Sequence, residues 1–180
     1  VLLANDFRNL ALRAVEGLNL GSKIEEMSFH PEGRRKDTTE AAKIFKKEGV
    51  KSVISLGGDG TQRDLVLGWI DAPLLPISTG TNNVFPFMVD PTVAGTAAGL
   101  VASGELVIEE VSKQAKVIHV DLPNGVKDLA LVDVVLVDDR QTGSRAVVKP
   151  DSVKQVLAAI ADPASIGLAS IAGRSNPVYF

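Results

Sequence analysis

The stretch Leu56-Gly57-Gly58-Asp59-Gly60-Thr61 decides the predicted fold, because it joins two segments of different character. The apolar residues 50–56 predict a buried strand, and residues 62–70 predict a short helix. Three glycines in four positions allow positive φ angles and a close approach of the backbone to a ligand. N–H groups at the start of the following helix favour an anion. The stretch therefore predicts a strand–loop–helix unit whose loop binds an anionic ligand.

Asp59 needs an explanation of its own, because a carboxylate repels phosphate unless it holds a hydroxyl, a proton or a metal. The alternative is a tight turn in which Asp59 caps the helix. A P-loop is excluded, since Thr61 and Gln62 rather than Lys follow the last glycine. The dinucleotide-binding fingerprint also fails. Arg63 occupies the place of its third glycine, and residues 76–84 contain no acidic residue.

A second polar loop, Ser78-Thr79-Gly80-Thr81-Asn82-Asn83, follows an apolar segment at 73–77 that predicts another strand. Its hydroxyls, glycine and amides can form hydrogen bonds with a sugar or a phosphate. In a parallel sheet the loops after successive strands lie at the same edge, where such folds bind ligands. Turn formation and helix capping are the alternative for Asn82-Asn83 taken alone. Together, the two loops predict one ligand-binding crevice.

The remaining segments predict an α/β protein whose two parts differ. Before Gly104, strands alternate with helices, which implies a parallel sheet covered by helices. After it, alternating residues at 117–122 and the turn Pro123-Asn124-Gly125 predict antiparallel β structure. We therefore predict an N-terminal parallel-sheet, Rossmann-like domain at 1–104 and a β-rich C-terminal domain at 105–180, with both ends of the chain cut. The other predicted elements are strands at 1–4, 24–29 and 127–137 and helices at 6–18, 37–48 (with Asp37 in a capping box), 91–103 and 151–161.

Composition narrows the class of protein. Of the 180 residues, 45% are hydrophobic and 23% are charged, which are ordinary values for a globular chain. The formal net charge of −3 makes the protein a poor general nucleic-acid binder. There is no Cys, so disulfides, iron–sulfur clusters and cysteine nucleophiles are excluded. The absence of Cys and of any Asn-x-Ser/Thr sequon fits a cytoplasmic protein, which we expect, without a nucleic-acid partner. The apolar stretches are too short to span a bilayer, so we expect no membrane partner.

The two loops resemble those of the NAD kinase and diacylglycerol kinase superfamily, through Gly57-Gly58-Asp59-Gly60-Thr61 and Thr79-Gly80-Thr81-Asn82. The longer run from Pro73 to Pro86 resembles a branch of it, the ATP-NAD/AcoX kinase family. Asp37-Thr38 and the segment 128–133 are similar to the same branch. The resemblance covers most of the chain.

This resemblance implies a kinase with a nucleotide in the cleft between an α/β domain and a β-rich domain. Asp59 would orient or deprotonate the acceptor hydroxyl, with Mg²⁺-ATP as the usual phosphoryl donor, an effect worth roughly 10²–10⁴-fold. Asp133 matches the acidic residue that binds the ribose side of NAD. The implied nucleotide-binding residues are Gly57, Gly58, Gly60, Thr61, Thr81, Asn82, Asn83 and Asp133. Small-molecule nucleotides and a second copy of the chain, in a homo-oligomer, are the expected partners.

Three positions depart from the family pattern. Val132 stands where NAD kinases carry Asn, and Asn83 stands where lipid kinases carry Asp. The usual loop after the first strand is missing, since Asn5 runs straight into Asp6. The expected function is ATP-dependent phosphorylation of NAD at the adenosine ribose 2'-hydroxyl, giving NADP. The alternatives are a superfamily kinase acting on a lipid or a small diol, and a nucleotide-binding accessory protein of a catabolic operon with little turnover.

Two further groups of residues are weaker candidates. The run Arg34-Arg35-Lys36 can contact phosphates or form a solvated loop. His30 and His119 are too far apart in sequence for a zinc-binding spacing. The metal ligands therefore stay unassigned.

Overall fold

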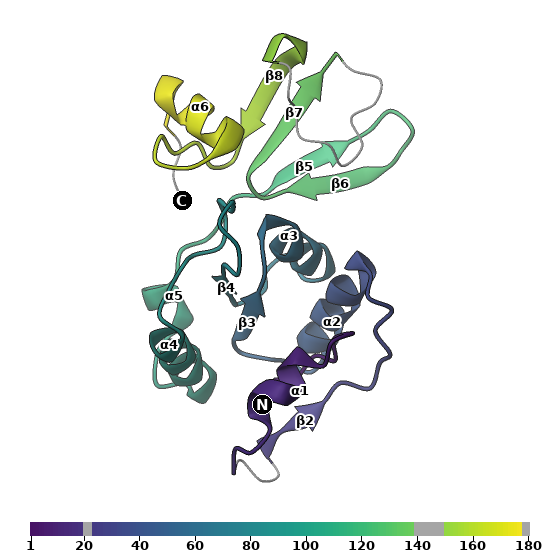
Figure 1. Cartoon of the computed structure of the whole chain (residues 1–180), viewed down its shortest axis with the longest axis vertical. Helices are drawn as coiled ribbons and strands as arrows, with labels where there is room; N and C mark the ends of the chain where they lie inside the picture. The colour runs from purple at the N-terminus through teal and green to yellow at the C-terminus, as the bar shows by residue number, and fades with distance from the viewer. Residues whose placement is uncertain (20–22, 139–149, 178–180) are drawn as a thin grey trace.

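The computed structural model describes residues 1–19, 23–138 and 150–177. Strands of the N-terminal half pair in parallel, and strands of the C-terminal part pair antiparallel. The predicted α/β fold class is therefore confirmed (Figure 1). The elements are β1 (Leu2–Leu3), α1 (Leu10–Val15), β2 (Glu25–Glu26), α2 (Arg35–Lys47), β3 (Val53–Leu56), α3 (Asp59–Gly68), β4 (Leu74–Ile77), α4 (Pro91–Ser103), α5 (Ile108–Val111), β5 (Ile118–Asp121), β6 (Lys127–Ala130), β7 (Asp133–Val137), the 3-10 helix η2 (Pro150–Ser152), β8 (Val153–Ala158) and α6 (Gly167–Ser175).

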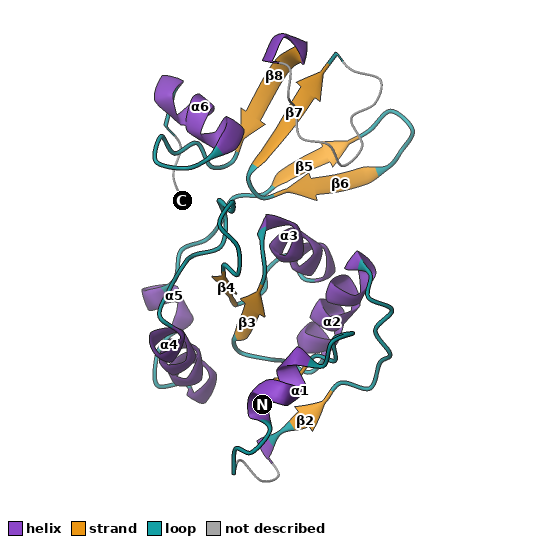
Figure 2. Cartoon of the chain, in the orientation of Figure 1, coloured by secondary structure: helices purple, strands orange, loops and turns teal. Residues whose placement is uncertain are grey.

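Strands β3 and β4 form the parallel pair that positions both loops. Val53 lies opposite Leu74, and Leu56 lies opposite Ile77. Because the two strands end in register, the loops that follow them leave the same edge. Helices cover the pair: in Figure 2, β3 and β4 lie between α4 on one side and α2 with α3 on the other.

Helices α2 and α3 pack closely against each other and against β3. Ala42, Val53 and Leu65, one residue from each element, form a buried cluster. At Gly68 the helices approach so closely that a Cβ would collide with the carbonyl oxygen of Thr39. This contact fixes α3, and with it the loop at its N-terminus, against the rest of the N-terminal half.

Strands β1 and β2 form a second parallel pair, with Leu2 opposite Glu25. Within the described residues this pair has no ladder hydrogen bonds to β3 and β4. The parallel sheet that we expected is thus divided into two pairs. Strand β1 contains two residues instead of the predicted four, so it offers few backbone groups for a second neighbouring strand.

Two predicted helix starts are wrong for the same reason, a carboxylate that binds backbone N–H groups nearby. Helix α2 begins at Arg35, and Asp37 is its third residue rather than its N-cap. The Asp37 carboxylate accepts hydrogen bonds from the N–H groups of Gly33 and Arg34 at 2.8 and 3.0 Å. Helix α1 begins at Leu10 rather than at residue 6, because Asp6 closes a turn by accepting from later N–H groups.

The C-terminal part contains two antiparallel pairs. The predicted hairpin is confirmed: β5 pairs with β6, and Gly125 has a φ of 79° in the turn between them. The prediction of one continuous strand at 127–137 is wrong: the segment forms two strands, β6 and β7, separated by Leu131 and Val132. The two pieces belong to different sheets, because β7 pairs with β8. This break forms a corner, residues 130–133, that reaches the candidate site.

The helix predicted at 151–161 is wrong. Its apolar residues recur at helical spacing, but the segment forms the strand β8, with Val156 opposite Val135 of β7. Valine favours strands because its branched side chain packs well on a pleated surface. Pairing with β7 therefore overrides the local spacing.

The predicted helix 91–103 is confirmed as α4. Asp90 caps it by accepting from the N–H groups of Thr92 and Val93, and Gly104 ends it with a φ of 82°. The domain boundary near Gly104 stays a prediction. No helix among the described residues is long and apolar enough to cross a membrane.

A buried apolar cluster connects the two parts of the chain. It joins α3, the segment after β4, strand β6 and the corner that follows it, and the residues after β8. Burial of such side chains is the main favourable contribution to holding the parts together. Its members are Val66, Phe85, Leu129, Leu131 and Ile160.

Candidate functional site

The two predicted loops contact each other through Asp59. The N–H of Phe85 donates to Asp59 Oδ1 at 2.8 Å, and the N–H of Val84 donates to both carboxylate oxygens at 3.1 Å. In return, the N–H of Asp59 donates to Asn83 Oδ1 at 3.3 Å. The loops therefore form one unit at the edge of β3 and β4.

Asp59 does not cap its own helix. Gly58 is the N-cap of α3, with no side-chain capping bond, and the Asp59 carboxylate turns away toward the second loop. The capping interpretation is therefore wrong. Oδ1 accepts two hydrogen bonds and Oδ2 accepts one, so Oδ2 keeps a lone pair for a further donor.

The three glycines of the first loop have different surroundings. A Cβ at Gly57 would lie 2.5 Å from Thr61 Oγ1, and a Cβ at Gly58 would lie 2.5 Å from Asn83 Oδ1. Both glycines are thus required by contacts within the protein. A Cβ at Gly60 meets no atom within 4 Å. Gly60 is the glycine of this loop that leaves room for a ligand.

A cavity of about 350 Å³ lies beside the paired loops. Asp59, Gly60 and Asn82 line it from the loops, and Asp133 lines it from the start of β7. Four of the predicted site residues thus reach one cavity. The remaining lining residues are Arg63, Val84, Ala130, Leu131, Val132, Ile166, Gly167 and Leu168.

Other predicted site residues lie outside this lining. Thr61 packs against Gly57, and Thr81 donates to Asn82 Oδ1 at 3.3 Å on the surface. Asn83 connects the loops, since its Nδ2 donates to Ser78 Oγ at 2.9 Å while its Oδ1 accepts from the first loop. Their roles in nucleotide binding stay predictions.

Sequence reasoning missed two parts of the cavity wall. Arg63 follows Asp59 by one helical turn, so its side chain shares that face of α3, and this spacing could have identified it. Residues 166–168 come from the start of α6, far along the chain. No local pattern in their sequence points to the loops.

Asp133 is half-buried, and its environment disfavours the charged form. Burial raises the pKa of the Asp133 carboxyl above its ordinary value, and the negative charge of Asp59 raises it further. Two carboxylates thus influence each other across one cavity. A hydroxyl or a cation placed between them would reduce this repulsion.

The run Arg34-Arg35-Lys36 contributes to the fold. Arg35 donates to both carboxylate oxygens of Asp64, from Nε at 2.8 Å and from Nη2 at 2.7 Å. Asp64 is buried, so this bidentate pair anchors α2 to α3. Arg34 is exposed and lies 3.5 Å from Glu32. Neither arginine is among the residues that line the 350 Å³ cavity.

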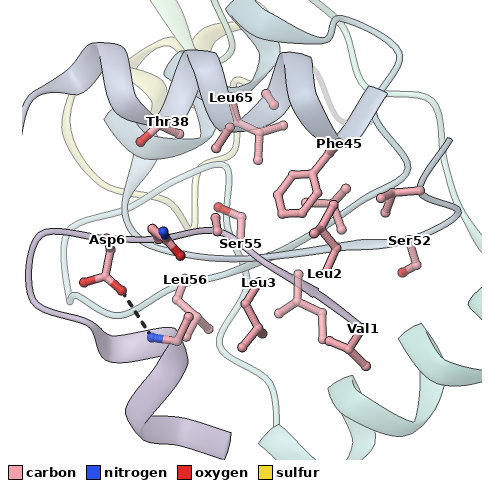
Figure 3. Close-up of a pocket in the computed structure, with 18 of the residues that line it drawn as sticks. Val1, Leu2, Leu3, Asp6, Thr38, Phe45, Ser52, Ser55, Leu56 and Leu65 are labelled. Atoms are coloured by element: carbon pink, nitrogen blue, oxygen red, sulfur yellow. Dashed lines mark hydrogen bonds between the residues drawn. The ribbon is translucent and has the colours of Figure 1, made fainter. Parts of the chain in front are cut away.

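A second cavity, of about 940 Å³, lies between β1 and β3, with further lining residues from α1, α2 and α4. Mainly apolar side chains line it, among them Leu2 and Leu3 of β1, Phe45 of α2 and Leu65 of α3 (Figure 3). Asp59 is not part of its lining.

The described residues contain no group of three or more His, Cys, Asp and Glu side chains placed to hold a metal ion. Mg²⁺ commonly binds through one or two carboxylates together with substrate phosphates. The carboxylates of Asp59 and Asp133 at one cavity are compatible with that mode of binding.

Comparisons with known proteins agree with the motifs. The family model for the ATP-NAD kinase N-terminal domain matches residues 4–106, and the model for the acetoin catabolism protein X C-terminal domain matches residues 116–180. The chain is 40% identical over 159 residues to acetoin catabolism protein X of Cupriavidus necator. That match covers 86% of this chain and 44% of the relative, so the chain spans less than half of the relative's length. No solved structure gives a significant match. The kinase-type N-terminal domain, the AcoX-type C-terminal domain and the paired loops show that this chain belongs to the ATP-NAD kinase and AcoX family.

Proposed function

We propose that this protein transfers a phosphoryl group from ATP to the adenosine ribose 2'-hydroxyl of NAD, giving NADP. The observation that supports this proposal is the placement of Asp59 and Asp133 in one cavity, together with Gly60 and Asn82. Carboxylates orient ribose hydroxyls by accepting hydrogen bonds. An open glycine backbone at a helix start suits a phosphate. The cavity thus offers the groups that a nucleotide with a reactive hydroxyl requires.

In the proposed reaction, Asp59 Oδ2 accepts a hydrogen bond from the 2'-hydroxyl and receives its proton as the oxygen attacks the γ-phosphorus of ATP. The bond from phosphorus to the bridging oxygen breaks, and ADP leaves. Phosphoryl transfer depends on positioning and charge stabilisation more than on covalent chemistry. Asp59 is well placed for positioning, because the N–H groups of Val84 and Phe85 fix its carboxylate. Mg²⁺, when bound with ATP, supplies positive charge to the phosphates.

Asp133 is assigned to binding rather than to chemistry. Its carboxyl lines the same cavity and accepts hydrogen bonds when it is ionised. A volume of about 350 Å³ is at the small end for ligand sites, so it suits part of a dinucleotide rather than both substrates together. We therefore place the adenosine ribose of NAD at Asp59 and Asp133.

A second candidate is an AcoX-type protein that binds nucleotide with little turnover. Three observations favour it. The Asp59 carboxylate already accepts three hydrogen bonds from the N–H groups of Val84 and Phe85, which leaves one free lone pair, on Oδ2, for a substrate. Val132 lines the cavity where NAD kinases carry Asn. The relative at 40% identity is named for acetoin catabolism and not for NADP synthesis.

A kinase for lipids has less support. It would require an apolar channel that reaches Asp59. Asp59 does not line the larger, mainly apolar cavity, and the cavity that it does line, though partly apolar, has a volume of only about 350 Å³.

An assay for NADP formation distinguishes these candidates. The full-length protein is incubated with NAD, MgCl₂ and ATP, and NADP is detected with an NADP-specific dehydrogenase. We expect NADP that depends on ATP and disappears in Asp59→Asn. If no NADP forms while NAD still raises the melting temperature, the protein binds nucleotide without turnover. Phosphorylation of diacylglycerol without any NADP would establish the lipid alternative.

A further inference from the structure

Arg63 connects the first loop to the C-terminal part of the chain. It lies in the first turns of α3, directly after the glycine loop. Its Nε donates to the carbonyl oxygen of Leu129 at 2.8 Å, and its Nη2 is hydrogen-bonded to the carboxylate of Asp128. Both partners belong to β6, more than sixty positions along the sequence.

The guanidinium of Arg63 is itself held in place. Its Nη1 donates to Asp64 Oδ1 at 3.1 Å, and Asp64 is buried and also bound by Arg35. All three guanidinium nitrogens of Arg63 therefore have protein partners. Only 23% of its side chain is exposed, so its bonds to Leu129 and Asp64 are partly protected from competition with water, whereas Asp128 lies at the surface.

The segment that Arg63 holds leads directly to Asp133. After Leu129 the chain turns through residues 130–133, all of which line the 350 Å³ cavity. On its far side this corner is fixed by Val132, whose carbonyl oxygen accepts from the N–H groups of Ala159 at 2.8 Å and Ile160 at 3.2 Å. Arg63 thus provides a polar attachment between α3, the helix that begins at Asp59, and β6, the strand that leads into the corner.

We propose that Arg63 is a positioning residue, whose bonds to Leu129 and Asp128 hold the corner 130–133 beside the glycine loop and so place Asp133 opposite Asp59. This inference rests on the proposed function only where it concerns NAD. The attachment itself is a property of the protein without ligand. Arg63 acts through Asp133 and contributes no chemical step.

Hydrogen exchange of the full-length protein tests the attachment without any ligand. In Arg63→Met we expect amides of β6 and the corner to exchange about tenfold faster or more, as loss of a charge-assisted hydrogen bond implies. Amides of α2 should keep their rates, because Arg35 still binds Asp64 through two bonds. Arg174→Met, on the exposed face of α6, is the matched control. Unchanged exchange in residues 127–133 would overturn the proposal.

A double-mutant cycle tests the consequence for the site. Asp133→Ala should weaken NAD binding in the otherwise unchanged protein, but by less than about twofold when Arg63 is already Met, because both changes remove the same contact. Binding of ATP should change little in either background. Additive effects on NAD binding would contradict a role through Asp133. If the unchanged protein binds no NAD, the proposed function fails, and the exchange result alone decides the role of Arg63.

Asp128→Asn gives a milder variant in case Arg63→Met does not fold. It keeps an acceptor for Arg63 but removes the charge, so the corner should exchange faster by a smaller factor. An exchange rate in residues 127–133 equal to that of the unchanged protein would count against the proposal.

Discussion

The cavities of about 940 Å³ and 350 Å³ differ in size and in the residues that line them, and the smaller one contains the candidate site. The larger cavity, about 940 Å³, is lined mainly by apolar side chains from β1, α1, α2, β3 and α4. The smaller, about 350 Å³, contains two carboxylates, an open glycine and an asparagine amide. A large apolar pocket is the usual first choice for a ligand site, provided that polar groups converge in it. The larger cavity also has polar residues in its lining, among them Asp6, Asp37 and Thr38, but Asp59 and Asp133 line the smaller one, so the candidate site is assigned by these two carboxylates and not by size.

The cavities also differ in how the chain forms them. The larger one lies where β1 and β3 are not hydrogen-bonded to each other, and it results from the division of the parallel strands into two pairs. The smaller one is built from four separate segments that hydrogen bonds and a buried cluster hold together. Changes in the smaller cavity should therefore affect ligands and catalysis, and changes in the larger one should affect stability.

The largest expected effect is that of Asp59→Asn. We predict that turnover falls by at least about 10²-fold, as loss of a positioned proton acceptor implies. Folding should be nearly unchanged, because the Asn side-chain oxygen still accepts from the N–H groups of Val84 and Phe85. Steady-state rates of NADP formation and the melting temperature measure the two effects.

Asp59→Ala is the comparison variant. It removes the acceptor as well as the carboxylate, so it should also lower the free energy of unfolding, by about 1–3 kcal/mol. If Asp59→Asn keeps full turnover while Asp59→Ala destabilises, Asp59 only connects the loops.

Asp133→Ala should have the next largest effect. We predict about tenfold weaker NAD binding, which corresponds to the loss of one charge-assisted hydrogen bond. Calorimetric titration with NAD and with ATP separates the two nucleotides, and the affinity for ATP should change little. The matched control is Asp138→Ala, an exposed acidic residue just after the same strand that pairs with Lys154 at 3.5 Å. Equal effects of the two substitutions would contradict a specific role for Asp133.

A third prediction contrasts two glycines of the same loop. Gly58→Ala places a Cβ 2.5 Å from Asn83 Oδ1 and displaces this side chain from its hydrogen bonds with the N–H of Asp59 and with Ser78, so it should destabilise the protein by about 1–3 kcal/mol. In Gly60→Ala the added Cβ meets no atom within 4 Å, so this substitution should not lower stability while it weakens nucleotide binding. Chemical denaturation and titration with NAD measure these effects. Equal loss of stability in both variants would mean that the contact with Asn83 is not the reason why position 58 requires glycine.

Much of the site could be predicted from the sequence, because its central part is local. The strands before both loops and the glycine and asparagine content of the loops are short-range signals, and parallel pairing brings such loops together. The contribution of Arg63 was missed because its partners Leu129 and Asp128 depend on how the two parts of the chain pack. Residues 166–168 were missed for the same reason.

The errors in the fold have a common physical cause. Local signals were correct where they did not compete with tertiary contacts, as at the capped helix α4. They failed at residues 153–158, where pairing with β7 selects a strand in a segment of helical spacing. They failed again at Leu131 and Val132, where a continuous apolar run turns to join two sheets. In both cases the neighbour that decides the structure is distant in the sequence.

The pH dependence of stability gives a smaller effect with a defined sign. Burial and the charge of Asp59 raise the pKa of Asp133 above its ordinary value of 3.8. The folded state then binds this proton more tightly than the unfolded state, so its contribution to stability is present at low pH and is lost as pH rises through the raised pKa. Asp133→Asn has no carboxyl to ionise, so it should not lose stability as pH rises through this pKa. In denaturation without nucleotide or metal, the variant should gain stability relative to the unchanged protein from pH 4 upward, whereas a constant difference would show that Asp133 does not titrate abnormally.

The smallest expected effect comes from the larger cavity, at Gly99 of α4. This glycine lines the apolar cavity, and a Cβ there meets no atom within 4 Å. Alanine favours the interior of a helix over glycine, so Gly99→Ala should raise the free energy of unfolding by about 0.5–1 kcal/mol. It should leave NADP formation and NAD affinity unchanged, because the larger cavity contains none of the groups that the proposed reaction uses. Denaturation curves and the coupled assay, with Gly60→Ala measured alongside, provide the comparison. If Gly99→Ala lowered turnover as much as Gly60→Ala, the larger cavity would belong to the site, and the functional contrast between the two cavities would be wrong.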